Sequence, residues 1–163
     1  MFERLISLVG KDKFSKLQSI KVLVVGIGGV GGYAFEALVR SGFTNITIAD
    51  GDVIEESNLN RQIITSSKLV GMKKVEAAKK RALEINPNIN INIIGEFINF
   101  SNFEDLLMKD NYDYVIDACD DLDLKFLLIK NSNRYKLISS MGTANKINPS
   151  LFSITTLDKT SND

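Results

Sequence analysis

The sequence predicts an α/β fold: a doubly wound, Rossmann-like, mostly parallel sheet with helices on both faces. Short apolar runs alternate with segments of helical periodicity and short connections, which is the pattern of successive βαβ units. The first apolar run, KVLVVGI at residues 21–27, is continuous and β-branched, as expected for a central parallel strand covered on both faces. A glycine-rich turn follows this run directly. Together these features indicate a nucleotide-binding type of sheet.

The other elements follow in chain order. An amphipathic stretch at 2–17, broken near Gly10, predicts a short helical arm before the first strand. The expected strands after 21–27 are 45–49, 89–95, 114–117 and 136–140, with a further one at 151–157. The expected helices are 31–41, ending before Gly42, 72–85, ending at Asn86-Pro87, 101–109, capped by Ser101, and 122–133.

The chain of 163 residues suits one domain, with an N-terminal helical arm at 1–18 and a nucleotide-binding core at 19–149. The polar end after residue 157 predicts that the natural protein continues, so that 1–163 is truncated at its C-terminus. Twenty basic residues balance twenty acidic ones, so the chain has no net charge that would attract nucleic acid or an anionic membrane. No apolar run has the length of a membrane span and no signal peptide is evident, so we expect a cytoplasmic protein without a membrane partner.

The residue inventory excludes several chemistries. The sequence has one cysteine, Cys119, and no histidine. An internal disulfide, a His/Cys zinc site and histidine general-base catalysis are therefore excluded for this chain. Cys119 lies among small residues, and we expect it to be packed rather than nucleophilic.

The glycine-rich turn has the sequence G-I-G-G-V-G at 26–31. Gly26 permits the tight turn, Gly28 and Gly29 allow close approach of phosphate, and Gly31 allows helix and strand to pack. The N-terminus of the following helix offers free N–H groups to an anion. The alternative is a tight turn that binds no ligand.

Asp50 ends the second strand, where a carboxylate can accept hydrogen bonds from ribose hydroxyls. A turn cap is the other interpretation of this residue. The glycine turn and Asp50 together are equally compatible with NAD and with ATP.

Two cations farther along favour ATP over NAD. Transfer of a nucleotidyl group concentrates negative charge on the α-phosphate and the leaving pyrophosphate, and fixed cations stabilise it. The planar guanidinium of Arg61 can donate two hydrogen bonds to phosphate oxygens, and the ammonium of Lys74 supplies a compact positive charge. A dehydrogenase has no need of this pair. The competing interpretation is that both are ordinary surface residues.

Two carboxylates follow the strand at 114–117, in the sequence D-A-C-D-D. Asp117 and Asp120 are expected at the carboxyl end of a parallel strand, where they could hold Mg²⁺ that bridges phosphates. The alternative is a helix N-cap at this position. The sequence contains no Walker P-loop.

Six motifs of the sequence, taken together, resemble those of a known protein superfamily. In order they are G-I-G-G-V-G, D-G-D, S-N-L-N-R-Q, V-G-M-K-K-V, I-N-P and D-A-C-D-D, and they resemble the ThiF/MoeB/HesA superfamily of ubiquitin-activating-type adenylyltransferases. The resemblance implies homodimers in which an N-terminal arginine, here Arg4, reaches the ATP of the partner. It implies the following ligand contacts: the loop around Gly29 on phosphate, Asp50 on ribose, Asn58, Arg61 and Lys74 on phosphates, Asp52 and Gln62 in the same site, and Asp120 on Mg²⁺.

A second set of motifs narrows the resemblance. F-E-R at 2–4, E-A-L-V-R-S-G-F at 36–43, S-S-M-G-T-A-N-K-I-N-P at 139–149 and L-D-K-T-S-N-D at 157–163 look like the tRNA threonylcarbamoyladenosine dehydratase branch. This branch activates the carboxylate on adenosine 37 of tRNA with ATP and closes a ring with net loss of water. Its members continue for roughly a further third of their length, a portion that is absent here.

Three other functions are compatible with the sequence. The first is an adenylyltransferase that activates the C-terminal glycine of a ubiquitin-like sulfur-carrier protein, with a sulfur-transfer partner. The zinc-binding cysteine pairs of such activators are absent from this sequence. The second is an NAD-dependent oxidoreductase, and the third is a fragment that only binds nucleotide or dimerises.

Overall fold

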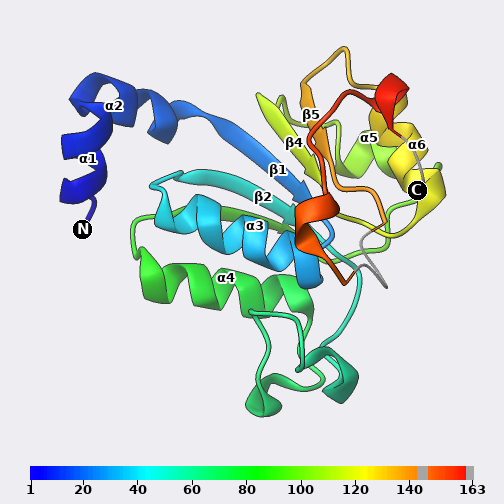
Figure 1. Ribbon diagram of the computed structural model, residues 1–163. Helices are drawn as coiled ribbons and strands as arrows, with labels where there is room; N and C mark the ends of the chain where they lie inside the picture. The colour runs from blue at the N-terminus through cyan, green and yellow to red at the C-terminus, as the bar shows by residue number, and fades with distance from the viewer. Residues whose placement is uncertain (143–146, 161–163) are drawn as a thin grey trace.

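In the computed structural model, which describes residues 1–142 and 147–160, five parallel strands form one sheet in the order β3-β2-β1-β4-β5 (Figure 1). The strands are β1 (Lys21–Val25), β2 (Asn45–Ala49), β3 (Asn90–Ile94), β4 (Tyr114–Asp117) and β5 (Lys136–Ser139). The chain moves outward from β1 to β3 and then returns to place β4 on the other side of β1. Such a reversal opens a crevice at the carboxyl ends of the two central strands.

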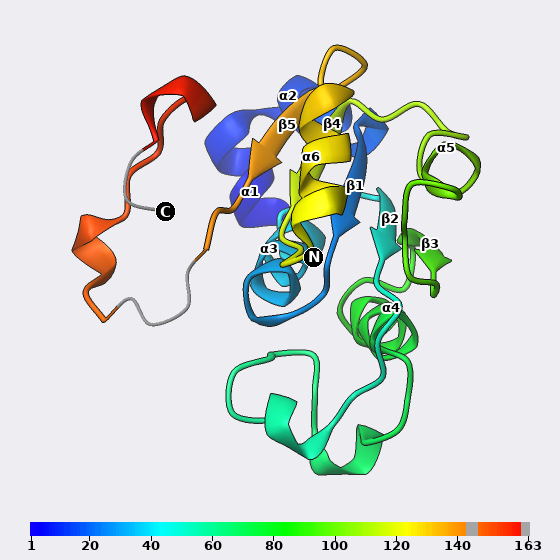
Figure 2. The same ribbon diagram turned by 90° about the vertical axis from the view of Figure 1, so that its right-hand side faces the viewer.

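Helices cover both faces of this sheet, which confirms the predicted fold class (Figures 1 and 2). α3 (Gly29–Arg40) and α4 (Lys74–Ile85) pack on one face, and α5 (Phe103–Leu106) and α6 (Leu122–Lys130) on the other. Successive side chains of a strand point to opposite faces. Val22 and Val24 of β1 therefore join the core under α3 and α4, whereas Leu23 and Val25 join the core under α5 and α6. This explains why the first strand is apolar at every buried position.

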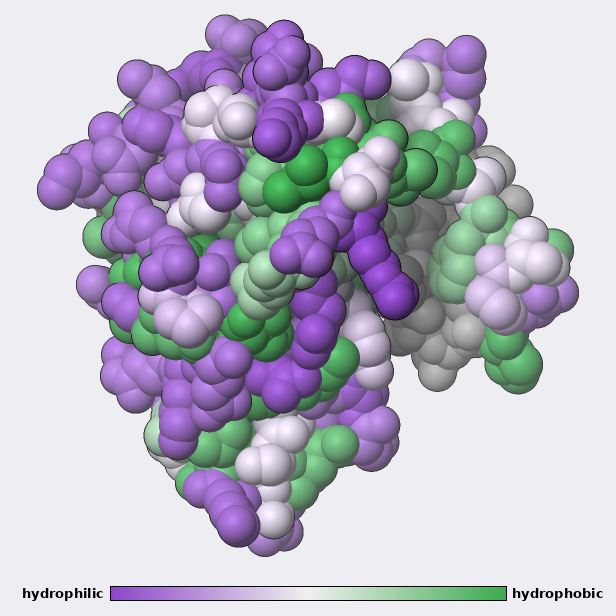
Figure 3. All heavy atoms as spheres, turned by 90° about the vertical axis from the view of Figure 1, so that its left-hand side faces the viewer, coloured by the Kyte–Doolittle hydropathy of each residue, from purple (hydrophilic) through white to green (hydrophobic). Residues whose placement is uncertain are grey.

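The N-terminal arm consists of two helices, α1 (Glu3–Val9) and α2 (Lys11–Ser19). Gly10 separates them with a φ of 86°, as the break in the sequence pattern predicted. The centroids of the Phe2 and Phe14 rings lie 5.4 Å apart, and Phe14 packs against Gly42 in the turn between α3 and β2. The arm therefore lies at the amino ends of the strands. From this side, the surface is mainly hydrophilic with smaller hydrophobic patches (Figure 3).

Two sequence predictions need correction. Residues 151–157 form no strand: 3₁₀ turns at Pro149–Leu151 and Leu157–Lys159 flank irregular chain. Leu151 and Ile154 are 80% and 107% exposed, and the described residues give this segment no neighbouring strand with which to pair (Figure 2). Ser101 does not cap its helix, because its hydroxyl donates instead to Asn99 Oδ1 at 2.6 Å.

Helix and strand ends also differ by several residues from the expected ones, most of all at α5, which is one turn long. The remaining regular elements are 3₁₀ turns at Glu56–Asn58 and Ser67–Leu69. Part of the 139–149 motif falls on residues 143–146, and the closing motif ends at 161–163; both lie outside the described residues. None of the helices described is both long and apolar enough to cross a membrane.

One buried carboxylate joins α3 to α4. Glu36 is 6% exposed and pairs with Arg40 at 2.6 Å on its own helix and with Arg81 at 3.1 Å on α4. Burial alone would raise the pKa of Glu36, but the hydrogen bonds and charges of Arg81 and Arg40 outweigh it and bring the pKa below its ordinary value of 4.5.

We predict that Glu36→Gln lowers the free energy of unfolding by about 1–3 kcal/mol at neutral pH, because both arginines lose a charged acceptor. A carboxyl with a lowered folded-state pKa stabilises the fold above its unfolded pKa, and this contribution is lost as pH falls through the folded pKa. Urea unfolding at pH 7 and at successively lower pH should show the two proteins converging below pH 4.5. Glu96→Gln, an exposed control, should show no such difference; a gap of constant size at all pH values would contradict the account.

Candidate nucleotide-binding site

The carboxyl ends of the central strands lie side by side, and hydrogen bonds continue beyond the strands themselves. The Gly26 N–H donates to Ala49 O at 2.8 Å, and the Ala118 N–H donates to Val25 O at 2.8 Å. The Asp50 N–H donates to Ile94 O at 3.0 Å. Residues that follow β1, β2 and β4 are therefore held at one edge of the sheet, where the sequence placed the candidate site.

The glycine turn depends on backbone contacts that admit no side chain. Gly26 has a φ of 85°, and a Cβ there would lie 2.7 Å from Ala118 O. A Cβ on Gly31 would lie only 1.8 Å from Gly26 O. α3 begins at Gly29 and has no side-chain cap at Gly28, so its first N–H groups remain available to an anion. The turn and packing roles predicted for Gly26 and Gly31 agree with this geometry.

Asp50 ties the second strand to the glycine turn. Its carboxylate accepts from the Ile27 N–H at 2.7 Å and from the Asp52 N–H at 2.8 Å. Burial raises the pKa of Asp50 above its ordinary value of 3.8, although the two N–H donors act in the opposite direction. Each carboxylate oxygen has a second lone pair, so the group can still accept from a ribose hydroxyl.

Lys74 stands at the start of α4 and is almost completely buried, at 6% exposure. The Lys74 ammonium pairs with the Asp52 carboxylate at 2.6 Å, and the backbone N–H of Lys74 donates to the backbone oxygen of Asp52 at 3.0 Å. This pair lies beside a cavity of about 510 Å³. The lining residues are Gly51, Asp52, Val53, Glu55, Asn58, Lys74 and Phe97.

Arg61 lies against the glycine turn. Its side-chain carbons come within 3.8 Å of the position that a Cβ of Gly29 would occupy. Its guanidinium is exposed and donates to Ser57 O at 2.8 Å and to Asn60 Oδ1 at 3.1 Å. The guanidinium therefore remains accessible to an anion at the start of α3.

Two side chains close to Arg61 in sequence, those of Asn58 and Gln62, carry buried amide groups. Asn58 is 8% exposed, and its Oδ1 accepts from the Glu55 N–H at 3.0 Å. Gln62 is 5% exposed and approaches Gly28. In the part of the chain that the structure describes, Gln62 Oε1 is buried without a hydrogen-bond partner. An unpaired acceptor of this kind is costly, so a donor on a bound ligand or a water would be favourable here.

The two candidate magnesium ligands have different environments. Asp120 is exposed, whereas Asp121 caps α6 by accepting from the Leu124 N–H at 3.0 Å. Asp117 is fully buried and pairs with Lys125 at 2.8 Å, so its carboxylate is already engaged. Among the described residues, no three His, Cys, Asp or Glu side chains form a metal-binding group. A single carboxylate fits Mg²⁺ only if phosphate oxygens and water complete the shell, as is common for this ion.

Arg4 is the one predicted nucleotide ligand that is not near the others. It lies on α1, at the end of the sheet opposite the glycine turn (Figure 1). Its chain therefore does not bring it to its own candidate site.

Sequence reasoning missed Phe97, which lines the cavity beside Asp52 and Lys74. Its ring lies on Gly51, where a Cβ would be 2.7 Å from the Phe97 Cγ, yet the side chain is 68% exposed. An aromatic residue just after the third strand was the available signal, because that position faces the same edge of the sheet as Asp50.

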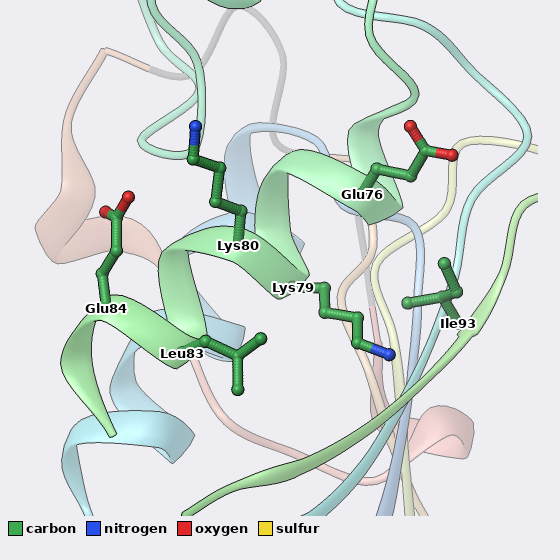
Figure 4. Close-up of a pocket in the computed structure, with 6 residues that line it drawn as sticks. All are labelled: Glu76, Lys79, Lys80, Leu83, Glu84 and Ile93. Carbon is green, nitrogen blue, oxygen red and sulfur yellow. The ribbon is translucent and has the colours of Figure 1, made fainter. Parts of the chain in front are cut away.

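A second hollow lies on the outer side of α4 next to the edge strand β3 (Figure 4). Its lining consists of Glu76, Lys79, Lys80, Leu83, Glu84 and Ile93. Charges of both signs surround two apolar side chains, and none of the predicted ligands takes part. This is the pattern of a solvated helix face whose lysine stems cover apolar surface.

The fold and the site together define a nucleotide-binding α/β domain of the doubly wound class. The chain belongs to the ThiF family, which matches residues 2–160. It is 38% identical to the tRNA threonylcarbamoyladenosine dehydratase of Bacillus subtilis (strain 168) over 99% of this chain and 64% of that protein. The structure of the Escherichia coli tRNA N6-threonylcarbamoyladenosine dehydratase, TcdA, in complex with ATP superposes with a TM-score of 0.92 at 34% identity.

That superposition covers 98% of this chain and 66% of the Escherichia coli one, so the present chain spans about two thirds of the length of these relatives. The adenylyltransferase and sulfurtransferase UBA4 of Saccharomyces cerevisiae (strain RM11-1a) is 40% identical, but over only 69% of this chain and 25% of that protein. The dehydratase of Bacillus subtilis therefore matches more of the chain than UBA4 does.

The glycine contacts give a matched pair of variants. Gly31→Ala should destabilise the fold by about 1–3 kcal/mol, because its methyl group would meet the backbone oxygen of Gly26. Gly32→Ala should be neutral or stabilising by up to about 1 kcal/mol, since its methyl would make ordinary contact with Ile63 and alanine favours helix. Denaturant unfolding of both variants measures the difference. Equal stabilities would contradict the described turn.

Proposed function

We propose that this chain binds ATP at the carboxyl edge of its sheet and uses it to activate a carboxylate as the adenylate. The proposed substrate is threonylcarbamoyladenosine 37 of tRNA, with Arg61, Lys74 and Asp120 as the catalytic residues. The observation that carries the proposal is the connected set at the glycine turn: Arg61 lies on Gly29, and Asp50 links that turn to the Asp52–Lys74 pair. Arg61 thus contacts the phosphate-binding turn directly, and Lys74 is connected to it through Asp52 and Asp50.

The reaction balances without a covalent enzyme intermediate. A carboxylate oxygen of the substrate bonds to the α-phosphorus of ATP, the bond to the β-phosphate oxygen breaks, and pyrophosphate leaves. A nucleophile within the substrate then attacks the activated carbonyl carbon and gives up its proton to solvent, the bond from that carbon to the phosphate oxygen breaks, AMP leaves with the former carboxylate oxygen, and a ring closes. Arg61 and Lys74 stabilise the charge that develops on the phosphates. Asp120 would hold Mg²⁺, which would neutralise phosphate charge when bound.

The cations favour ATP over NAD in this proposal. A hydride-transfer site would leave Arg61 and Lys74 without a role, whereas phosphate transfer needs fixed positive charge. The likeness to a relative whose structure was determined with ATP supports the same choice. Binding of NADH in place of ATP would favour the oxidoreductase instead.

The choice of tRNA over a sulfur-carrier protein rests on the relatives and on Cys119. The dehydratase relatives match nearly the whole chain, and UBA4 matches a smaller part. Cys119 is held against Asp117, and burial together with that carboxylate raises the pKa of its thiol to about 12. Such a thiol is a poor nucleophile at neutral pH, so a thioester or persulfide on this chain is disfavoured. Exchange of pyrophosphate driven by a small carrier protein would reverse this choice.

We include a homodimer in the proposal, with Arg4 directed to the ATP of the partner. Its place on α1, away from the site of its own chain, agrees with a role across an interface and gives it none within one protomer.

Arg61 gives the direct test of the activation step. Arg61→Ala should lower ATP–pyrophosphate exchange driven by modified tRNA by about 10²–10³-fold, since a fixed charge on the transferring group is lost. Arg134→Ala is the matched control, because this exposed arginine pairs with Glu104 and lies away from the site. Exchange that is equal in the two variants would refute the role given to Arg61.

Phe97 tests where the nucleoside lies. Its ring lies on Gly51, the residue after Asp50, and borders the cavity beside Asp52 and Lys74, so we propose that adenine stacks on it. Phe97→Ala should weaken ATP binding by about 1–3 kcal/mol, a typical value for loss of base stacking. Phe100→Ala removes an aromatic side chain that is 82% exposed and does not line the cavity. Calorimetric titration with ATP should therefore separate the two variants, and equal affinities would place adenine elsewhere.

A further inference from the structure

The buried ion pair beneath the turn that carries Asp120 has no part in the proposed chemistry. Lys125 of α6 has a side chain that is only 10% exposed, and the Asp117 side chain is 0% exposed. Their Nζ–Oδ2 distance is 2.8 Å. Taking two charges out of water is costly, and well-packed apolar residues often stabilise a fold equally well. The pair is therefore better explained by the geometry it fixes than by stability.

That geometry involves four parts of the chain. Asp117 Oδ1 accepts from the Cys119 N–H at 3.2 Å and from its thiol at 3.0 Å, which shapes the turn after β4. Asp117 Oδ2 accepts from Lys125 and from the Ser139 hydroxyl on β5. Lys125 also donates to Ser140 O at 3.0 Å. One ammonium and one carboxylate thus join the end of β4, the following turn, α6 and the end of β5.

Asp120 depends on this arrangement. It stands in the turn between β4 and α6, and no hydrogen bond of its exposed side chain occurs within the described parts of the chain. Its position is therefore set by the backbone of the turn. Asp117 holds that backbone at Cys119, and the Asp121 cap holds it at the start of α6.

We propose that Lys125 is a positioning residue for the nucleotide site: by pairing with Asp117 it fixes the turn that presents Asp120 to the phosphates. The inference rests on the proposed function, because it assigns Asp120 to Mg²⁺. Without the ammonium, the Asp117 carboxylate would be left buried and uncompensated, and it would draw in water or turn away from Cys119. The turn would then no longer hold Asp120 in one place.

The test compares ATP binding with Mg²⁺ and with EDTA, by calorimetry, for the unaltered chain, Lys125→Met and Lys130→Met. Lys130 lies on the same helix and is exposed, so its variant controls for lost charge. Lys125→Met should weaken binding in Mg²⁺ by about 10- to 100-fold, the usual effect of removing a partner behind a metal ligand. Binding in EDTA should change by less than about threefold, because the glycine turn is untouched. An unchanged Mg²⁺ effect in folded Lys125→Met would overturn the inference.

A double variant guards against simple misfolding. Asp117→Asn with Lys125→Met removes both buried charges, and denaturant unfolding should show stability recovered relative to Lys125→Met alone. Its Mg²⁺ effect on ATP binding should remain weak if Lys125 positions Asp120, whereas full recovery of that effect would reduce Lys125 to a stabilising role and overturn the inference. Absence of ATP binding by the unaltered chain would instead contradict the proposed function.

Discussion

Close approach of backbone to backbone at the glycine turn is the constraint on which the rest of the structure depends. Gly26 and Gly31 leave no room for a side chain, so α3 can begin immediately after β1. This places unpaired N–H groups of the helix in the crevice between β1 and β4. Asp50 secures the turn from the neighbouring strand by accepting from Ile27. A rigid site for an anion follows from sterics before any charged side chain is considered.

The basic side chains around that turn are of two kinds, exposed and buried. Arg61 is exposed, and within residues 1–142 and 147–160 its guanidinium donates to Ser57 O and Asn60 Oδ1, partners that it can exchange for a phosphate. Lys74 and Lys125 are buried and each is matched by a carboxylate, Asp52 and Asp117 respectively. The Lys125–Asp117 pair is enclosed by the fold and holds its turn in place, whereas the Lys74–Asp52 pair lines the cavity, where half of the Asp52 side chain is exposed. We therefore assign a positioning role to Lys125, and phosphate binding to Arg61 and Lys74.

The sequence predicted the parts of this site that local rules govern. The glycine turn, Asp50 and the alternation of strands and helices follow from backbone geometry and hydrophobic pattern, and the fold class was confirmed. The partner of Asp117 was not predictable, because Lys125 reaches it through packing of α6 on the sheet. The strand expected at 151–157 was wrong for the related reason that an apolar, β-branched run forms a strand only where another strand can pair with it. Phe97 was missed because its role depends on a loop that sequence alone does not place.

The central claim is that ATP, with its phosphates at the glycine turn, is the nucleotide this chain binds. The most direct measurement is a ¹⁵N–¹H NMR titration of the chain with ATP and, separately, with NADH. We predict that ATP shifts the backbone amides of 26–31, 50–62 and 74, while NADH at the same concentration leaves them in place. Shifts at these amides with NADH but not ATP, or ATP shifts confined to the outer face of α4, would contradict the account.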